Sequence, residues 1–151
     1  MALWNRLRES AHATRSRFTA GRNALRSAVF RDAAMAMCAL VAAADGTAAA
    51  AGRQRAAALI STSELLANFE AGDLHWRFDD YLAKLTADFP FGKIGVLHDI
   101  GRVRGRPAEA RAVIRLGVAV GWADGRLDGG EKAVIREACR AVGLSPADFD
   151  L

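Results

Sequence analysis

The sequence predicts an all-α fold: a single-domain helical bundle of about seven to eight helices. Alanine is abundant, whereas β-branched and aromatic residues are few, the aromatic fraction being 7%, and this balance favours helices over strands. A length of 151 residues suits one domain that buries a sizeable core. The apolar fraction of 52% and the charged fraction of 25% are typical of a soluble globular protein.

Residues 1–31 form a basic amphipathic arm whose composition differs from that of the rest of the chain. Seven arginines and one glutamate give the arm a net charge of +6, which leaves −2 for the helical domain, residues 32–151. Three interpretations stay open: a loosely packed helix with solvated arginines, an interfacial element on an anionic membrane, and a nucleic-acid contact, which the scarcity of stacking aromatic groups disfavours. Under the membrane or partner interpretation, the contact residues are Trp4, Arg6, Arg8, Arg15 and Arg17.

Two nearly all-apolar segments, residues 33–44 and 108–123, predict helices buried at the centre of the bundle. The first holds 12 residues, and a bilayer-spanning helix needs about 20. Pro107 stands at the start of the second segment, where proline is favoured.

Shorter patterns predict the remaining helices. Ser61 and Glu64 have the spacing of a capping box, and Asp73 is placed to cap a helix whose apolar stripe contains Phe78 and Tyr81. Trp76 shares that helix and is expected in the core. The predicted helices besides the two buried ones are residues 48–60, 65–70, 74–89, 91–103, 131–142 and 146–150.

Both buried helices end at an Asp-Gly pair, and this repeat organises the chain. Asp45-Gly46 and Asp124-Gly125 are 79 residues apart, and each precedes another helix. Glycine suits the left-handed conformation that often follows a helix. Asp128 and Glu131 have capping-box spacing at the start of the last long helix, which is a sufficient reason for their presence. Capping does not explain an aspartate at the negative end of a helix.

The same carboxylates suggest a cation site. Asp124, Asp128 and Glu131 fall within eight residues and offer the hard oxygen ligands that Ca²⁺ and Mg²⁺ prefer. The spacing is not that of an EF-hand, and the first repeat has Gly52 in the place of Glu131. The predicted metal ligands are therefore Asp45, Asp124, Asp128 and Glu131, with Ca²⁺, Mg²⁺ or Zn²⁺ as the cation.

No pattern of catalytic residues accompanies these features. His12, His75 and His98 share no ligand spacing, and no Ser-His-Asp or Cys-His arrangement is visible. Cys38 and Cys139 match no zinc or redox motif and are expected as reduced, buried thiols. We therefore expect a protein that is not an enzyme.

The pattern Val120-Gly-Trp-Ala-Asp124-Gly-x-x-Asp128-x-x-Glu131-Lys132, followed by Gly143-Leu-Ser-Pro-Ala-Asp-Phe149, resembles the TerB family of tellurite resistance proteins. The likeness covers essentially the whole chain, including the basic arm and Asp45-Gly46. It implies an all-helical, cytoplasmic bacterial protein of the tellurite and stress-response systems, peripheral at the inner membrane and linked to a membrane protein partner. Acidic surface positions of the family are proposed to bind metal. The chain lacks the acidic residue that follows the first Asp in the family pattern.

The resemblance and the charges together predict a non-enzymatic interaction module at the cytoplasmic face of the membrane, with the Asp-Gly turns as docking or metal site. The alternative is a small divalent-metal-binding or sensing domain. A third hypothesis, an enzyme that acts on tellurite through Cys38 or Cys139, conflicts with the expected burial of both thiols.

Overall fold

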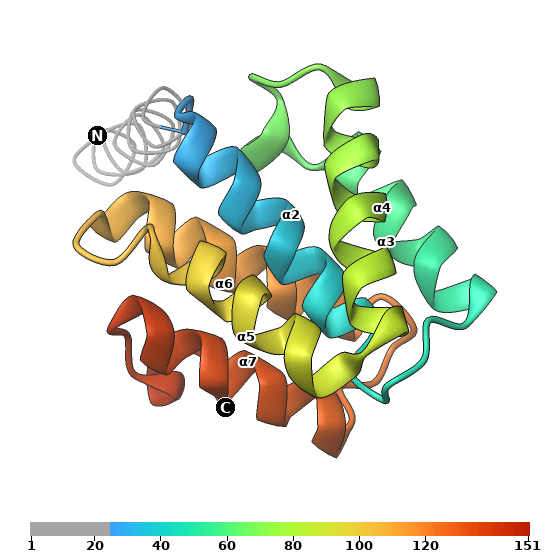
Figure 1. Ribbon diagram of the computed structural model, residues 1–151. Coiled ribbons are helices and arrows are strands. Elements are labelled where there is room, and N and C mark those ends of the chain that lie inside the picture. Colours follow the sequence, from blue (N-terminus) through green and yellow to red (C-terminus); the bar gives the residue numbers. More distant parts are fainter. Residues whose placement is uncertain (1–24) are drawn as a thin grey trace, which may run out of the picture.

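The computed structural model describes residues 25–151, which form an all-α bundle and contain no strand (Figure 1). The all-α class is as predicted; the described residues hold six α-helices, against about seven to eight expected in all. In chain order the elements are α2 (Ala28–Ala42), α3 (Ala50–Thr62), the 3₁₀ helix η1 (Glu64–Leu66), α4 (Ala71–Ala87), α5 (Phe89–Gly101), α6 (Pro107–Trp122), α7 (Gly129–Val142) and the 3₁₀ helix η2 (Pro146–Phe149).

Helix α2 is the centre of the bundle, as its apolar sequence predicts. Every side chain from Ala33 to Leu40 is 0% exposed, because α4, α5 and α6 pack around this helix (Figure 1). Ser27 begins the helix by accepting a hydrogen bond from the N–H of Phe30 at 3.0 Å. The helix thus starts inside the range assigned to the arm, whereas the arm residues assigned to membrane or partner contact lie outside the described residues.

Helix α6, the second buried helix, lies beside α2 (Figure 1). The Oγ of Ser27 at the start of α2 donates a hydrogen bond to the Oε1 of Glu109, in the first turn of α6, at 2.8 Å. Gly117 allows the two helices to approach closely, since a Cβ at this position would collide with the side chain of Met37. The two helices therefore begin at one end of the bundle and finish at the other.

Two capping predictions in the middle of the chain are wrong. Ser61 lies within α3, where its Oγ is 2.8 Å from Nε2 of His75, so it forms no capping box with Glu64. Helix α4 is capped by Glu70, whose carboxylate accepts hydrogen bonds from two backbone N–H groups of the first turn. Asp73, the predicted cap, is already inside the helix. A glutamate in the role of a cap is unusual, and the sequence pattern therefore pointed to the aspartate.

Two further predictions on this segment did not hold. Trp76 is 65% exposed, whereas Phe78 and Tyr81 on the same helix are buried as expected. Its spacing from the buried residues puts Trp76 on the outer side of α4, where Arg77 lies 6.0 Å from the ring centroid. The helix expected over residues 65–70 is reduced to the single 3₁₀ turn η1.

The last helix agrees closely with its sequence pattern. Helix α7 begins with the predicted capping box of Asp128 and Glu131 and ends at Gly143, which has a φ of +76°. Cys38 and Cys139 are buried and form no disulfide. None of the helices formed by residues 25–151 is long and apolar enough to cross a lipid bilayer.

Candidate functional site

The two Asp-Gly turns, distant in sequence, meet at one end of the bundle. They line a single cavity of about 240 Å³, here called the turn pocket. The four predicted metal-ligand residues are all among its lining residues. The lining consists of Val41, Ala42, Ala44, Asp45, Ala49, Ala51, Gly52, Arg55, Val120, Asp124, Asp128 and Glu131.

The two turns have the same local geometry. Gly46 and Gly125 have φ values of +84° and +86°, a conformation that glycine adopts without strain. Asp45 Oδ1 accepts a hydrogen bond from the N–H of Thr47 at 2.9 Å, and Asp124 Oδ1 accepts one from the N–H of Arg126 at 3.1 Å. Each aspartate therefore closes its own turn, as aspartates do when they bond the backbone two residues on. These turn hydrogen bonds explain the two aspartates, which helix capping does not.

Asp128 and Glu131 form the capping box in both directions. Asp128 Oδ1 accepts the hydrogen bond of the Glu131 N–H at 2.8 Å, and Glu131 Oε1 accepts that of the Asp128 N–H at 3.1 Å. The first turn of α7 lies close to the segment that follows α2, since a Cβ on Gly130 would be 3.7 Å from the carbonyl oxygen of Ala44. Capping holds these two carboxylates at the mouth of the turn pocket.

Arg55 is the functional candidate that sequence reasoning missed. This residue of α3 extends to the second turn, where its Nη2 is 3.8 Å from Asp124 Oδ2. Both side chains are more than 40% exposed, so the ion pair contributes little to stability. The ion pair matters for binding, because it shows that a guanidinium group fits against the carboxylates of the turn pocket. No motif links Arg55 to Asp124, which is 69 residues away in the sequence.

The carboxylates of the turn pocket perturb one another. The pKa of Glu131 is raised to about 7. Burial is the largest cause, and the side-chain hydrogen bond with Asp128 and the negative charges of Asp128 and Asp124 add to it. The backbone hydrogen bond from Glu131 holds the pKa of Asp128 below its ordinary value. A perturbed pKa in a cleft is typical of functional sites. Four carboxylates in the lining of one pocket favour a cationic ligand.

We predict that Glu131→Gln changes the pH dependence of stability. The ordinary pKa of glutamate is 4.5, and that of folded Glu131 is about 7. Between these two pH values the unfolded chain loses a proton that the folded protein retains. The free energy of unfolding of the wild type therefore falls as pH rises through this window. Glutamine keeps the accepting oxygen of the capping box and does not titrate. In urea unfolding, the variant should match the wild type near pH 4, below the ordinary pKa of 4.5, and exceed it at pH 8. An equal difference at both pH values would show that Glu131 titrates normally.

The carboxylates of the turn pocket are not arranged as metal ligands. Within residues 25–151, no group of three or more His, Cys, Asp or Glu side chains is placed to hold a metal ion. The carboxylates are instead engaged by backbone N–H groups, and Asp124 is also engaged by Arg55. As arranged, the turn pocket does not fit a metal ion.

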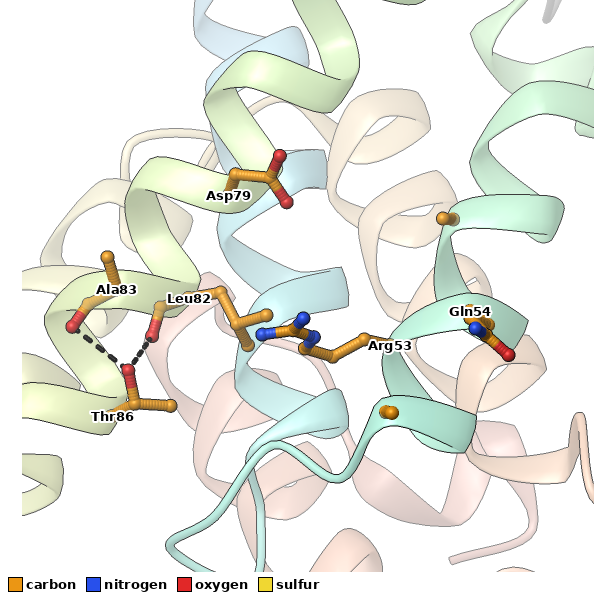
Figure 2. A pocket seen from close by; sticks show the side chains of 8 residues that line it. Arg53, Gln54, Asp79, Leu82, Ala83 and Thr86 are labelled. Carbon is orange, nitrogen blue, oxygen red and sulfur yellow. Dashed lines mark hydrogen bonds between the residues drawn. The ribbon is translucent and has the colours of Figure 1, made fainter.

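Two other hollows contain fewer convergent groups. One, of about 540 Å³, lies between α3 and α4, where Arg53 points across toward α4 below Asp79 (Figure 2). The other, of about 690 Å³, is mainly apolar and follows α4 and α5, with exposed Phe91 and Ile94 at its edge. Neither collects carboxylates from distant segments as the turn pocket does, and we therefore treat the turn pocket as the candidate site.

The cysteines lie apart from all three hollows. Both are fully buried, and burial raises the pKa of the Cys38 thiol to about 12. Burial likewise raises the pKa of Cys139. Because the thiolate is the reactive form, neither residue is suited to thiol chemistry on an oxyanion.

Comparison with known proteins agrees with the sequence resemblance. No curated protein and no solved structure matches the chain. A family model described as "Tellurite resistance protein TerB" matches residues 31–151. That match covers α2 from its first turn onward, both Asp-Gly turns and the C-terminal helices. The chain therefore belongs to the TerB family of tellurite resistance proteins.

Proposed function

We propose that this protein is a non-enzymatic interaction module of a bacterial tellurite-resistance and stress-response system. It acts at the cytoplasmic face of the inner membrane, where the turn pocket docks a membrane protein of the same system. One observation carries the proposal: the two Asp-Gly turns, 79 residues apart, present four carboxylates in one pocket.

The chemistry of the turn pocket indicates which group of the partner it binds. Four carboxylates face a single arginine, Arg55, among the lining residues. An arginine or lysine of the partner would pair with Asp45 and Asp124 and favour the ionised form of Glu131. Charge-assisted hydrogen bonds of this kind are stronger than neutral ones. The pocket is thus suited to a basic segment of the partner.

The basic arm, residues 1–31, would make the second contact that we propose, with the membrane surface. Its net charge of +6 favours the anionic headgroups of a membrane surface, and Trp4 is suited to the boundary between headgroups and acyl chains. Replacing Arg6, Arg8, Arg15 and Arg17 by glutamine in the full chain should reduce co-sedimentation with phosphatidylglycerol vesicles at low salt. Unchanged pelleting would exclude the arm as a membrane contact.

Site-specific photo-crosslinking tests the docking directly. A photoreactive amino acid in place of Ala49, an exposed residue of the turn pocket, should crosslink to a membrane protein in cells exposed to tellurite. The matched control places it at Ala83, which is also exposed but lines the hollow between α3 and α4. Equal crosslinking from both positions would contradict docking at the turn pocket.

Divalent-cation binding is the second candidate function. The charges of Asp128 and Asp124 favour it, because they add to burial in raising the pKa of Glu131 and a shared cation would offset their repulsion. The turn pocket would have to rearrange, since its oxygens are already hydrogen-bonded. Calorimetry with Ca²⁺, Mg²⁺ and Zn²⁺ should then show binding to the wild type that weakens in Asp124→Asn and strengthens when Arg55→Gln removes the competing cation. If the wild type shows no heat of binding with any of the three cations, the carboxylates serve only to cap the turns and the helix.

A further inference from the structure

Positive charge is concentrated at one end of the described bundle. The segment 102–115 contains five arginines and one acidic residue, Glu109, a net charge of +4. This segment is the loop between α5 and α6 together with the first turns of α6, at the left of the view in Figure 1. The turn pocket, with its four carboxylates, lies where α2 and α6 finish, at the opposite end. The bundle therefore has one strongly basic end, while at the other end Arg53, Arg55, Arg126 and Lys132 offset the four carboxylates.

Most of the positive charge at the basic end is not neutralised by the domain itself. Arg106 pairs with the buried Glu109 at 3.2 Å. Arg102, Arg104, Arg111 and Arg115 are exposed, and the part of the chain described by the structure offers none of them an ion pair or a side-chain hydrogen bond. We call these four residues the arginine surface. Because no ion pair within the described residues neutralises these four arginines, an anionic surface would compensate their charge.

The basic arm joins the bundle at this same end. Arg106 Nη1 is 3.4 Å from the Oγ of Ser27, the residue that caps α2 and follows the arm's first 26 residues. Residues 1–24 add a net charge of +4 from sequence alone. Gly143, at the end of α7, also lies here, since a Cβ on it would be 3.6 Å from Arg104 Nε. Arg140, in the last turn of α7, adds to the positive charge at this end. Asp148 and Asp150, which follow α7, offset only part of it.

We propose that the arginine surface docks on anionic phospholipid headgroups, so that the bundle stands end-on at the membrane with the turn pocket directed away from it. This inference rests on the proposed membrane role and extends it from the arm to the folded domain. The segment 102–115 supplies arginine charge but contains no aromatic residue, which suits a headgroup layer better than the bases of a nucleic acid, which stack on aromatic rings. The turn-pocket end has no excess positive charge to hold it on the lipids, so it stays in the aqueous phase, where the cytoplasmic part of the membrane protein partner can reach it.

Vesicle binding by the full chain tests the surface. The triple variant Arg102→Gln/Arg104→Gln/Arg111→Gln should bind phosphatidylglycerol vesicles roughly 10- to 100-fold more weakly than the wild type, given the usual effect of each basic residue near an anionic surface. The matched control, Arg53→Gln/Lys84→Gln/Arg126→Gln, removes the same charge from exposed positions and should bind nearly as the wild type does. Vesicles of phosphatidylcholine should bind neither protein.

The orientation is tested with a thiol-attached fluorophore. Cys38 and Cys139 are 0% exposed, so a single introduced cysteine is the reactive one. Ala108→Cys and Ala123→Cys place the label on exposed positions at the two ends of α6, about 22 Å apart along the helix. On vesicles the label at position 108 should shift to a less polar environment, and the label at position 123 should not.

The outcomes separate the inference from the proposed function. A wild type that fails to bind anionic vesicles overturns both. If both triple variants weaken vesicle binding equally, the arginine surface is not the lipid contact. If both labels shift equally, the end-on orientation is wrong. Either result leaves the membrane role of the arm intact. Tighter binding to duplex DNA than to vesicles, lost in the Arg102/Arg104/Arg111 variant, would identify the surface as a nucleic-acid contact and overturn the lipid assignment.

Discussion

Ile100→Ala lowers the free energy of unfolding by about 2–5 kcal/mol, the cost of truncating a buried isoleucine. Ile100 is 0% exposed on α5, which packs against α2, α4 and α7. Alanine is the better helix former, so the loss arises from packing and the cavity left behind. Urea unfolding followed by circular dichroism should show a lower midpoint with the same slope.

Ile94→Ala is the matched control on the same helix. Ile94 is 69% exposed, and its truncation should change the free energy of unfolding by no more than about 0.5 kcal/mol. Comparable losses from both variants would mean that α5 does not present its Ile100 face to the core.

Gly92→Ala lowers stability by roughly 1–3 kcal/mol, the usual cost of forcing extra volume into a packed position. A Cβ on Gly92 would lie 2.6 Å from the carbonyl oxygen of Lys84 and 2.9 Å from its carbonyl carbon. These atoms belong to the backbone of α4, so relief requires the helices α4 and α5 to separate. The loss should appear as a lower thermal midpoint.

Gly95→Ala should do the opposite. No atom of a neighbouring residue lies within 4 Å of a Cβ at this position of α5, and alanine gains about 0.5–1 kcal/mol over glycine in a helix. The two substitutions are chemically identical and three residues apart, so only the packing of α4 on α5 distinguishes them. Stabilisation by both would contradict that packing.

The sequence predicted the features that depend on neighbouring residues. The all-apolar runs located α2 and α6, since a helix without a polar face must be buried. Asp128, Glu131 and Gly143 marked the limits of α7, because caps are set by local hydrogen bonds. The left-handed turns at Gly46 and Gly125 followed from the same local chemistry.

Features that depend on the tertiary arrangement could not be predicted from the sequence. Nothing in the spacing shows that Arg55 reaches Asp124 or that the first turn meets the second, because both follow from how α2, α3 and α6 pack. Trp76 looked like a core residue by its type, yet its position on α4 leaves it on the surface. That the arginines of residues 102–115 gather at the end opposite the turn pocket also follows only from the fold.

The central claim is that the paired turns carry the function, and a resistance assay tests it most directly. Cells that lack the protein would be supplied with the wild type, with Asp45→Asn/Asp124→Asn, or with the exposed α4 control Asp79→Asn/Asp80→Asn. Asparagine can accept the same turn hydrogen bonds, so the fold is retained while two charges are lost. Tellurite resistance should return with the wild type and the control and fail with the turn variant. Full resistance with the turn variant, expressed at equal level, would contradict the claim.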